Sequence, residues 1–214
     1  MAGPSRAGYA QAERAALITL LCADGPDAPT LIEGWRTRDL AAHLIARDRR
    51  PDILPGLRLS RFAGHTERVR RAVADQPYGR ILDQLRHPPW WGLFNNRVAD
   101  ALINTLEYYL HHEDVRRGVP DWQPRELPAA QQAALWRPAS LLARLRLRRF
   151  PAALTITAPG HGTVTTGAGG EPLRLVGTPG ELVIFLSGRQ RAAQVQLDGP
   201  PPLAERLRTA PLNL

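Results

Sequence analysis

The segment NTLEYYLHHEDVRR, residues 104–117, carries the side chains of this sequence that are best suited to chemistry. Glu107 and His111 are four positions apart, and residues at that spacing lie on one face of a helix. Asp114 follows His111 by three positions and lies near the same face, whereas His112 is rotated by about 100°. A carboxylate and an imidazole on one helix face can form an ion pair or bind a divalent metal.

The direction in which this face points decides between those uses. Ile103 and Ala99 precede Glu107 at four-residue steps, so we expect the face to be apolar there and to point into a helical core. An unpaired buried carboxylate is very costly, which leaves pairing with an Arg or binding of a divalent metal. A metal also needs a third protein ligand from another helix. His43 in RDLAAHLIARD is the best candidate, because its apolar neighbours indicate an inward position.

His43, Glu107 and His111 form a two-His-one-Glu set, which is a ligand set of catalytic zinc with one position left for water or substrate. Helical bundles commonly build metal sites in this way. A Glu and a His at this spacing also occur by chance in many helices, so a solvated or ion-paired face remains the alternative. Asp114 has two interpretations as well: it orients His111, or it pairs with Arg117 near the end of the helix.

The elements that must position these residues are predicted to be helices. Apolar residues recur at helical spacing in four principal segments joined by loops, which predicts an antiparallel four-helix bundle. The segments cover residues 6–24, 37–50, 60–76 with a short continuation over 79–86, and 96–117. The last helix is expected to end at Gly118, a residue type typical of the position after a helix.

The pattern changes after Pro120. Residues 128–149 predict a connecting helical segment, with a kink expected at Pro138. In the last third of the chain the apolar period becomes two, which predicts strands around a helix that starts at Thr178. The expected fold is therefore α plus α/β: a helical bundle over residues 1–120, a connecting helical segment over 121–150 and a small α/β domain over 151–214.

Composition narrows the class of protein. The chain has 214 residues and no run that approaches the roughly 20 apolar residues of a membrane span. Its first 21 residues make a poor signal peptide, so we expect a cytoplasmic location and no membrane partner. Cys22 is the only cysteine, which excludes an internal disulfide and a cysteine-based zinc site.

The basic charge of the chain invites a nucleic-acid interpretation. The formal net charge is +8 and every basic residue is Arg, since the sequence contains no Lys. The densest basic stretch, residues 143–150, alternates Arg with Leu and lacks interleaved aromatic residues that could stack on bases. We therefore expect no nucleic-acid partner, although Arg clusters suit an anionic small molecule.

Three segments of the sequence together resemble one known family. GWRTRDLAAHL, NTLEYYLHHEDVRRG and GTPGELVIFLSGR, the last followed by VQLDG, are similar to the mycothiol-dependent maleylpyruvate isomerase family, which belongs to the DinB-like metal-binding bundles. The run EYYLHHEDVRRGVPDWQPREL resembles an uncharacterised actinobacterial branch of it more closely. The resemblance covers nearly the whole chain in order, and HHEDVRR is its most specific element.

The resemblance implies a DinB-like four-helix bundle that binds a divalent metal, usually zinc, through His43, Glu107 and His111. It also implies mycothiol, a low-molecular-weight thiol, as the cofactor whose sulfur meets the metal. The C-terminal domain of the family contributes an Arg near the thiol or substrate, for which we choose Arg189. The expected activity is that of a thiol-dependent isomerase or transferase acting on a small electrophilic substrate. The alternative is a non-catalytic metal-binding or regulatory protein of the same fold.

Overall fold

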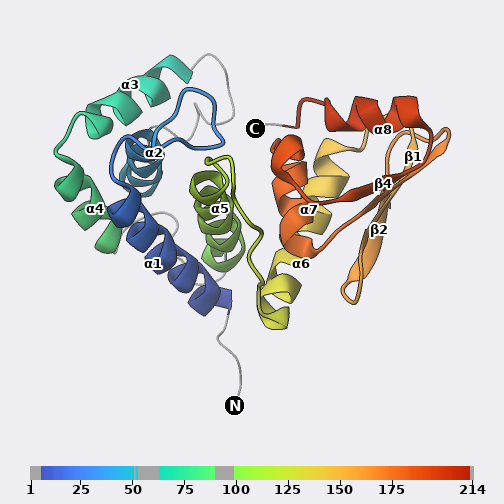
Figure 1. The fold of residues 1–214 in the computed structure, drawn as a ribbon, viewed down its shortest axis with the longest axis horizontal. Helices are drawn as coiled ribbons and strands as arrows, with labels where there is room; N and C mark the ends of the chain where they lie inside the picture. The colour runs from blue at the N-terminus through green and yellow to red at the C-terminus, as the bar shows by residue number, and fades with distance from the viewer. Residues whose placement is uncertain (1–5, 51, 53–62, 90–98, 213–214) are drawn as a thin grey trace. The chain divides into compact units, whose positions relative to one another are not determined.

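The structure, a computed structural model of the chain, describes residues 6–50, 52, 63–89 and 99–212. The chain divides into two compact units, residues 4–124 and 125–214, and each is described by itself (Figure 1). The predicted fold class, α plus α/β, is confirmed, because the first unit is helical and the second adds a four-stranded sheet to its helices. No helix within the described ranges is long and apolar enough to cross a bilayer.

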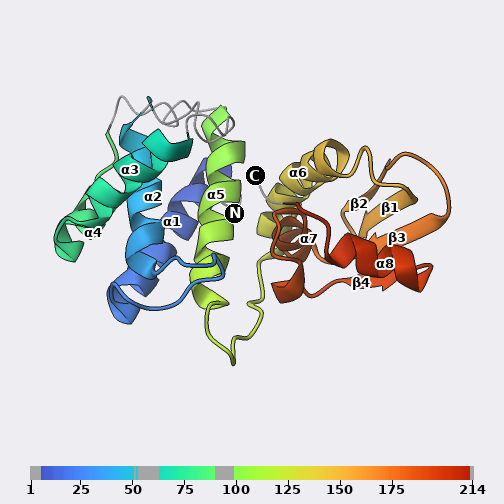
Figure 2. The ribbon, with the colours of Figure 1, turned by 90° about the horizontal axis from the view of Figure 1, so that it is seen from above.

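The first unit is a helical bundle. Its described helices are α1 (Arg6–Asp24), α2 (Thr37–Arg49), α3 (Ala63–Ala74), α4 (Tyr78–Arg86) and α5 (Ala99–Arg116). α1 packs along α5 and against α4, and α2 packs against α3 and α4 (Figure 2). The third helix of the expected bundle and its continuation are thus the separate helices α3 and α4. The expected starts of the third and fourth helices, at residues 60 and 96, lie outside the described residues.

Apolar side chains from α1, α2, α4 and α5 pack together in one core. Pairs of deeply buried side chains four positions apart come from α1, α2 and α4, and α5 adds Tyr108 and Val115; the pairs are Leu17 and Leu21, Leu40 and Leu44, and Ile81 and Leu85. Burial of side chains of this size stabilises the fold by roughly 1.5–3 kcal/mol each. This core fixes α2 and α5 as neighbours in one bundle, and these are the two helices that carry the candidate site.

The loop between α1 and α2 packs against the end of α5. The backbone nitrogen of Leu31 donates to the backbone oxygen of Asp114 at 2.9 Å. α5 ends at Arg116, near the predicted end, but Gly118 does not adopt the left-handed conformation typical of such glycines. A Cβ atom at Gly118 would lie 2.5 Å from the backbone oxygen of Pro29, so glycine is required by this close approach. The contact ties the segment that leads into α2 to α5.

The second unit combines helices with a mixed sheet. Its elements are α6 (Ala129–Arg146), β1 (Ala153–Ala158), β2 (Gly162–Thr166), β3 (Pro172–Val176), α7 (Pro179–Leu186), η3 (Gln190–Ala192), β4 (Gln196–Asp198) and α8 (Pro201–Arg208). The strand order is β2-β1-β3-β4; β1 and β3 are parallel, and each edge strand is antiparallel to its neighbour. α6, which we expected as a connecting segment, packs on α7 and β2 within this unit.

α7 begins where the sequence predicts. Thr178 precedes it, and its hydroxyl accepts a hydrogen bond from the backbone nitrogen of Glu181 at 3.4 Å, while Pro179 occupies the first turn. The helix ends before Gly188, whose φ of 86° is the left-handed conformation that glycine adopts without strain. Arg189 therefore lies three residues after the end of α7, directly after this glycine.

Candidate metal centre

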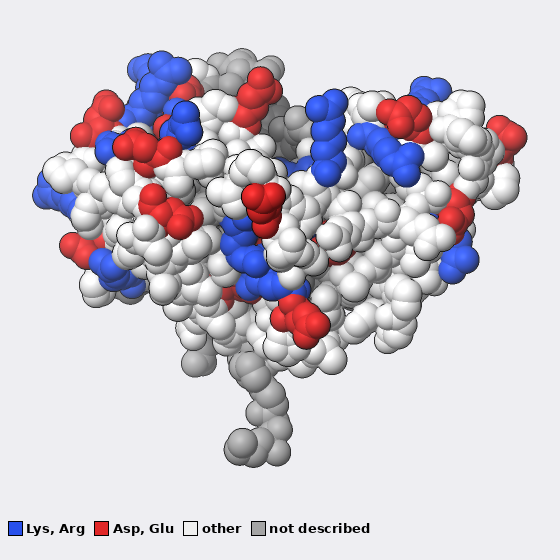
Figure 3. Space-filling view, in the orientation of Figure 1, with Lys and Arg blue, Asp and Glu red and all other residues white. Residues whose placement is uncertain are grey.

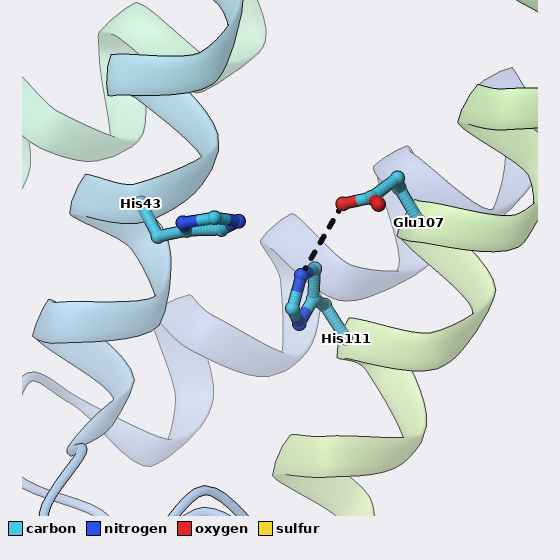
Figure 4. A group of neighbouring side chains, drawn as sticks. All are labelled: His43, Glu107 and His111. Carbon is cyan, nitrogen blue, oxygen red and sulfur yellow. Dashed lines mark ion pairs between the residues drawn. The ribbon is translucent and has the colours of Figure 1, made fainter. Parts of the chain in front are cut away.

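α2 and α5 bring His43, Glu107 and His111 together inside the first unit. One nitrogen or oxygen atom from each residue lies within 4.8 Å of the others. The ring centroids of His43 and His111 are 5.2 Å apart, and His111 Nε2 lies 3.4 Å from Glu107 Oε2 (Figure 4). In the part of the chain that the structure describes, no other cluster of His, Cys, Asp or Glu could hold a metal ion.

The donor set fits a divalent metal of the size of zinc. Zinc bonds to nitrogen and oxygen are about 2.0–2.1 Å long, so two ligands at a tetrahedral centre lie about 3.3 Å apart. The His111–Glu107 separation of 3.4 Å already matches that spacing. His43 approaches from α2, and its donor atom lies within 4.8 Å of those of Glu107 and His111.

Asp114 fixes the orientation of His111. Its Oδ2 atom lies 2.9 Å from His111 Nδ1, and the Asp114 side chain is completely buried. In the neutral ring, a proton on Nδ1 can be donated to Asp114, which leaves the Nε2 lone pair available to a metal. Of the two interpretations of Asp114, the structure therefore supports the orienting one. Arg117 pairs with Glu113, from Nε to Oε2, at 2.6 Å.

The electrostatics keep two of the three donors unprotonated at neutral pH. Burial and the charge of His111 lower the pKa of His43 to about 3. Burial alone would raise the pKa of Glu107, but its hydrogen bond to His111 and the nearby charges of His111 and Arg47 lower it to about 2. Burial lowers the pKa of His111, yet hydrogen bonds to Asp114 and Glu107 outweigh burial and raise it above its ordinary value.

An arginine also lies beside the donor set, as the ion-pair alternative requires. Arg47 Nε is 3.9 Å from Glu107 Oε2. Its Nη1 donates to Asp48 Oδ1 at 3.2 Å, and its Nη2 donates to Asn104 Oδ1. Asp48 in turn accepts a hydrogen bond from the Tyr108 hydroxyl at 3.1 Å. Sequence reasoning missed this network, although Arg47 follows His43 by one helical turn.

Trp35 covers the other side of His43. The Trp35 and His43 ring centroids are 5.4 Å apart, so the aromatic ring packs against the imidazole. Arg70 of α3 lies over the Trp35 ring at 4.9 Å, and it also pairs with Asp39 and, at 2.7 Å, with Glu67. The α1–α2 loop and α3 therefore hold the His43 ring in place. The only sign of this packing in the sequence is Trp35 itself, in the segment GWRTRDLAAHL.

His112 points to a different face of α5, as its helical position predicts. Its Nδ1 lies 2.8 Å from Glu13 Oε2 of α1, and both side chains are buried. The expectation that this face points into the core at Ile103 is wrong, because Ile103 is 41% exposed. Glu107 itself is 19% exposed, so this end of the donor set is accessible from solvent.

Arg189, the residue chosen in the C-terminal domain, belongs to the second unit. It is half-buried, and its Nη1 donates to the backbone oxygen of Ser187 at 2.6 Å. The face of the molecule in Figure 3 carries both acidic and basic side chains.

Comparison with known proteins relates the chain to one fold. No family model matches the sequence, and no curated protein matches it. Two solved structures match: a mycothiol-dependent maleylpyruvate isomerase, with a TM-score of 0.54, and a mutant of such an enzyme with a histidine changed to alanine, with a TM-score of 0.53. Each is 14% identical to this chain and covers 90% of it and 91% of its own length. The chain therefore shares the fold of mycothiol-dependent maleylpyruvate isomerase over nearly its whole length.

Proposed function

We propose that this protein binds one divalent metal ion, zinc most readily, through His43, Glu107 and His111. We further propose that it uses the metal in a mycothiol-dependent isomerase or transferase reaction on a small electrophilic substrate. The observation that carries the proposal is the convergence of two imidazoles and one carboxylate, with donor atoms within 4.8 Å of one another. Three protein ligands leave a tetrahedral metal one open position, which is the arrangement of catalytic rather than structural zinc.

The residues of the chain have separate parts in this proposal. His43 and His111 supply neutral nitrogen donors, and Asp114 holds His111 with its Nε2 facing the site. Glu107 supplies the negative charge that offsets part of the charge of a divalent cation. The metal, when bound, would lower the pKa of a thiol at the open position so that a thiolate exists near neutral pH.

The thiol and the substrate are proposed from the fold. The likeness to mycothiol-dependent maleylpyruvate isomerase supports mycothiol as the thiol. A thiolate can add to an activated double bond and leave again after rotation, which isomerises the substrate; it can also open an epoxide or displace a leaving group. Arg189 is proposed to bind a carboxylate of the substrate through two hydrogen bonds, as guanidinium groups commonly do.

A second candidate is a non-catalytic metal-binding or regulatory protein. One observation favours it: Glu107 already has ion-pair partners in Arg47 and His111, at 3.9 and 3.4 Å. A cluster satisfied in this way is stable without taking part in any reaction. The two candidates differ in whether a thiol reaches the metal.

The test is a titration of the cobalt-substituted protein with mycothiol, followed by absorption spectroscopy. We expect a sulfur-to-cobalt charge-transfer band that appears with mycothiol and not with its S-methyl derivative. If the band appears, formation of product from a small electrophile should depend on both metal and thiol. A spectrum that no thiol changes, or a fourth protein side chain closing the site, would refute the enzyme proposal and favour the second candidate.

A further inference from the structure

Arg47 is a buried cation that the proposed reaction does not use. It lies one helical turn after His43 on α2, so both side chains face α5. Its side chain is only 3% exposed, which rules out direct contact with a substrate in this conformation. We propose that Arg47 is a positioning residue of the metal centre, which holds the Glu107 carboxylate toward the two imidazoles before any metal binds. This inference rests on the proposed metal site and assigns the residue that prepares it.

The two terminal nitrogen atoms of the guanidinium each donate a hydrogen bond. Nη2 donates to Asn104 Oδ1 on α5, and Nη1 donates to Asp48 Oδ1 at 3.2 Å on its own helix. Nε then faces Glu107 Oε2 at 3.9 Å, which is an ion-pair distance. Because a guanidinium is planar and rigid, anchoring two corners fixes the third. Asn104 and Glu107 are three positions apart on α5, so one guanidinium reaches both.

The second support of the network lies behind Asp48. The Tyr108 hydroxyl donates to Asp48 Oδ2 at 3.1 Å, while Asp48 Oδ1 receives the hydrogen bond from Arg47. Tyr108 also belongs to the hydrophobic core of the bundle, so its position is set by packing. A chain of contacts therefore runs from the core through Tyr108, Asp48 and Arg47 to Glu107. Side chains locked by such contacts keep ligands within the small tolerance that a metal centre needs.

Arg47 could instead act as a competitor of the metal, because its positive charge repels a cation near Glu107. Two observations favour positioning. Asp48 lies 3.2 Å from Arg47 and offsets part of its charge. Without Arg47, the flexible side chain of Glu107 would lose its orientation, and Asp48, only 11% exposed, would lose its ion-pair partner. The two roles predict opposite changes in metal affinity when Arg47 is replaced.

The experiment measures zinc affinity by calorimetry and the visible spectrum of the cobalt-loaded protein. Arg47→Met should weaken zinc binding by about 10–100-fold, the usual effect of losing a residue that orients a metal ligand. It should also change the cobalt ligand-field bands, because Glu107 no longer has a fixed orientation. Asn104→Ala frees one corner of the guanidinium and should weaken binding in the same direction, by a smaller factor.

The matched control is Arg117→Met. Arg117 is equally buried, and its ion-pair partner at 2.6 Å is Glu113, which is not one of the proposed ligands. We expect its zinc affinity and cobalt spectrum to match those of the wild type even if its melting temperature falls.

Each possible result either supports or overturns the positioning role of Arg47. Unchanged or tighter zinc binding in Arg47→Met would overturn the positioning role and identify Arg47 as a competitor. If Arg47→Met does not fold, unchanged or tighter binding in Asn104→Ala overturns it instead, and weaker binding supports it. A wild-type protein that binds no zinc would refute the proposed metal site itself, and the inference with it.

Discussion

Asp114 and Glu113 are neighbouring carboxylates near the end of α5, and they have different partners. Both side chains are completely buried. Glu113 pairs with Arg117 at 2.6 Å, and Asp114 contacts His111 at 2.9 Å. From the sequence alone both partners of Asp114 were open, because each lies three positions away along the helix. The choice depends on side-chain directions that helical spacing does not determine.

Replacement of Asp114 tests its orienting role. Asp114→Asn keeps the size of the side chain but removes the charge that fixes the proton on His111 Nδ1. Zinc affinity is expected to fall by about 10–100-fold. Calorimetric titration of the metal-free variant measures this directly, with Arg117→Met again serving as the control. An affinity equal to that of the wild type would show that Asp114 has no influence on the ligand.

The pH dependence of metal binding follows from the three donors. Glu107 and His43, with pKa values lowered to about 2 and about 3, hold no proton near neutral pH. The pKa of His111 is raised above 6.5, so metal binding must release its proton. Zinc affinity should therefore still rise with pH above 6.5, where an ordinary imidazole has lost its proton, by up to about tenfold per pH unit for one released proton. A flat or falling affinity in calorimetric titrations over that range would contradict this assignment.

At the scale of elements, the periodicity of the sequence predicted where the helices lie, but it predicted less well which of their residues are buried. Helical spacing placed Glu107 and His111 on one face and His112 on another, since both follow from the geometry of a single helix. It also suggested a core position for Ile103, which is 41% exposed. Spacing gives the angle of a side chain around its helix, but it does not say how far along the helix the neighbouring elements extend.

The close contact between the α1–α2 loop and the end of α5 gives a stability prediction. Gly118→Ala would place a Cβ 2.5 Å from the backbone oxygen of Pro29, so the loop or the helix end must shift. We expect a loss of about 1–3 kcal/mol in the free energy of unfolding, the usual cost of overpacking. Urea denaturation would measure it.

A matched glycine provides the control for that variant. Gly79 in α4 has no atom within 4 Å of an added Cβ. Gly79→Ala should therefore be neutral or stabilise the fold by up to about 1 kcal/mol. Equal effects of the two substitutions would mean that the close approach at Gly118 has no energetic weight.

At the scale of the whole molecule, the position of α6 could not be read from its sequence. Its helical period was evident, but a helix between two domains can belong to either or to neither. In the structure its buried residues, among them Leu135, Ala139 and Ala143, lie in the second unit, where α6 packs on α7 and β2. All of α7 is buried, so this helix needs cover on several sides. The need of α7 for cover arises from tertiary packing, so the sequence of α6 by itself does not reveal that α6 provides it.

Truncation tests the membership of α6. A fragment of residues 125–214 is expected to fold with a cooperative thermal transition, because it contains the whole second unit. A fragment of residues 151–214 lacks α6 and should expose the apolar surface of α7, so we expect it to lack such a transition. Circular dichroism melting curves compare the two. Equally cooperative unfolding of both fragments would show that α6 is dispensable for this unit.

The most direct test of the account is a count of zinc bound per chain, by elemental analysis and calorimetry, after removal of metal with a chelator and reloading. We predict about one zinc per wild-type chain, and a loss of more than about 100-fold in affinity in His43→Ala, Glu107→Ala and His111→Ala, since even residues that only orient ligands contribute up to about that factor. His112→Ala should keep its zinc, because His112 faces Glu13 on another side of α5. Full zinc occupancy in the double variant Glu107→Ala/His111→Ala, or loss of zinc in His112→Ala but not in His111→Ala, would contradict the account.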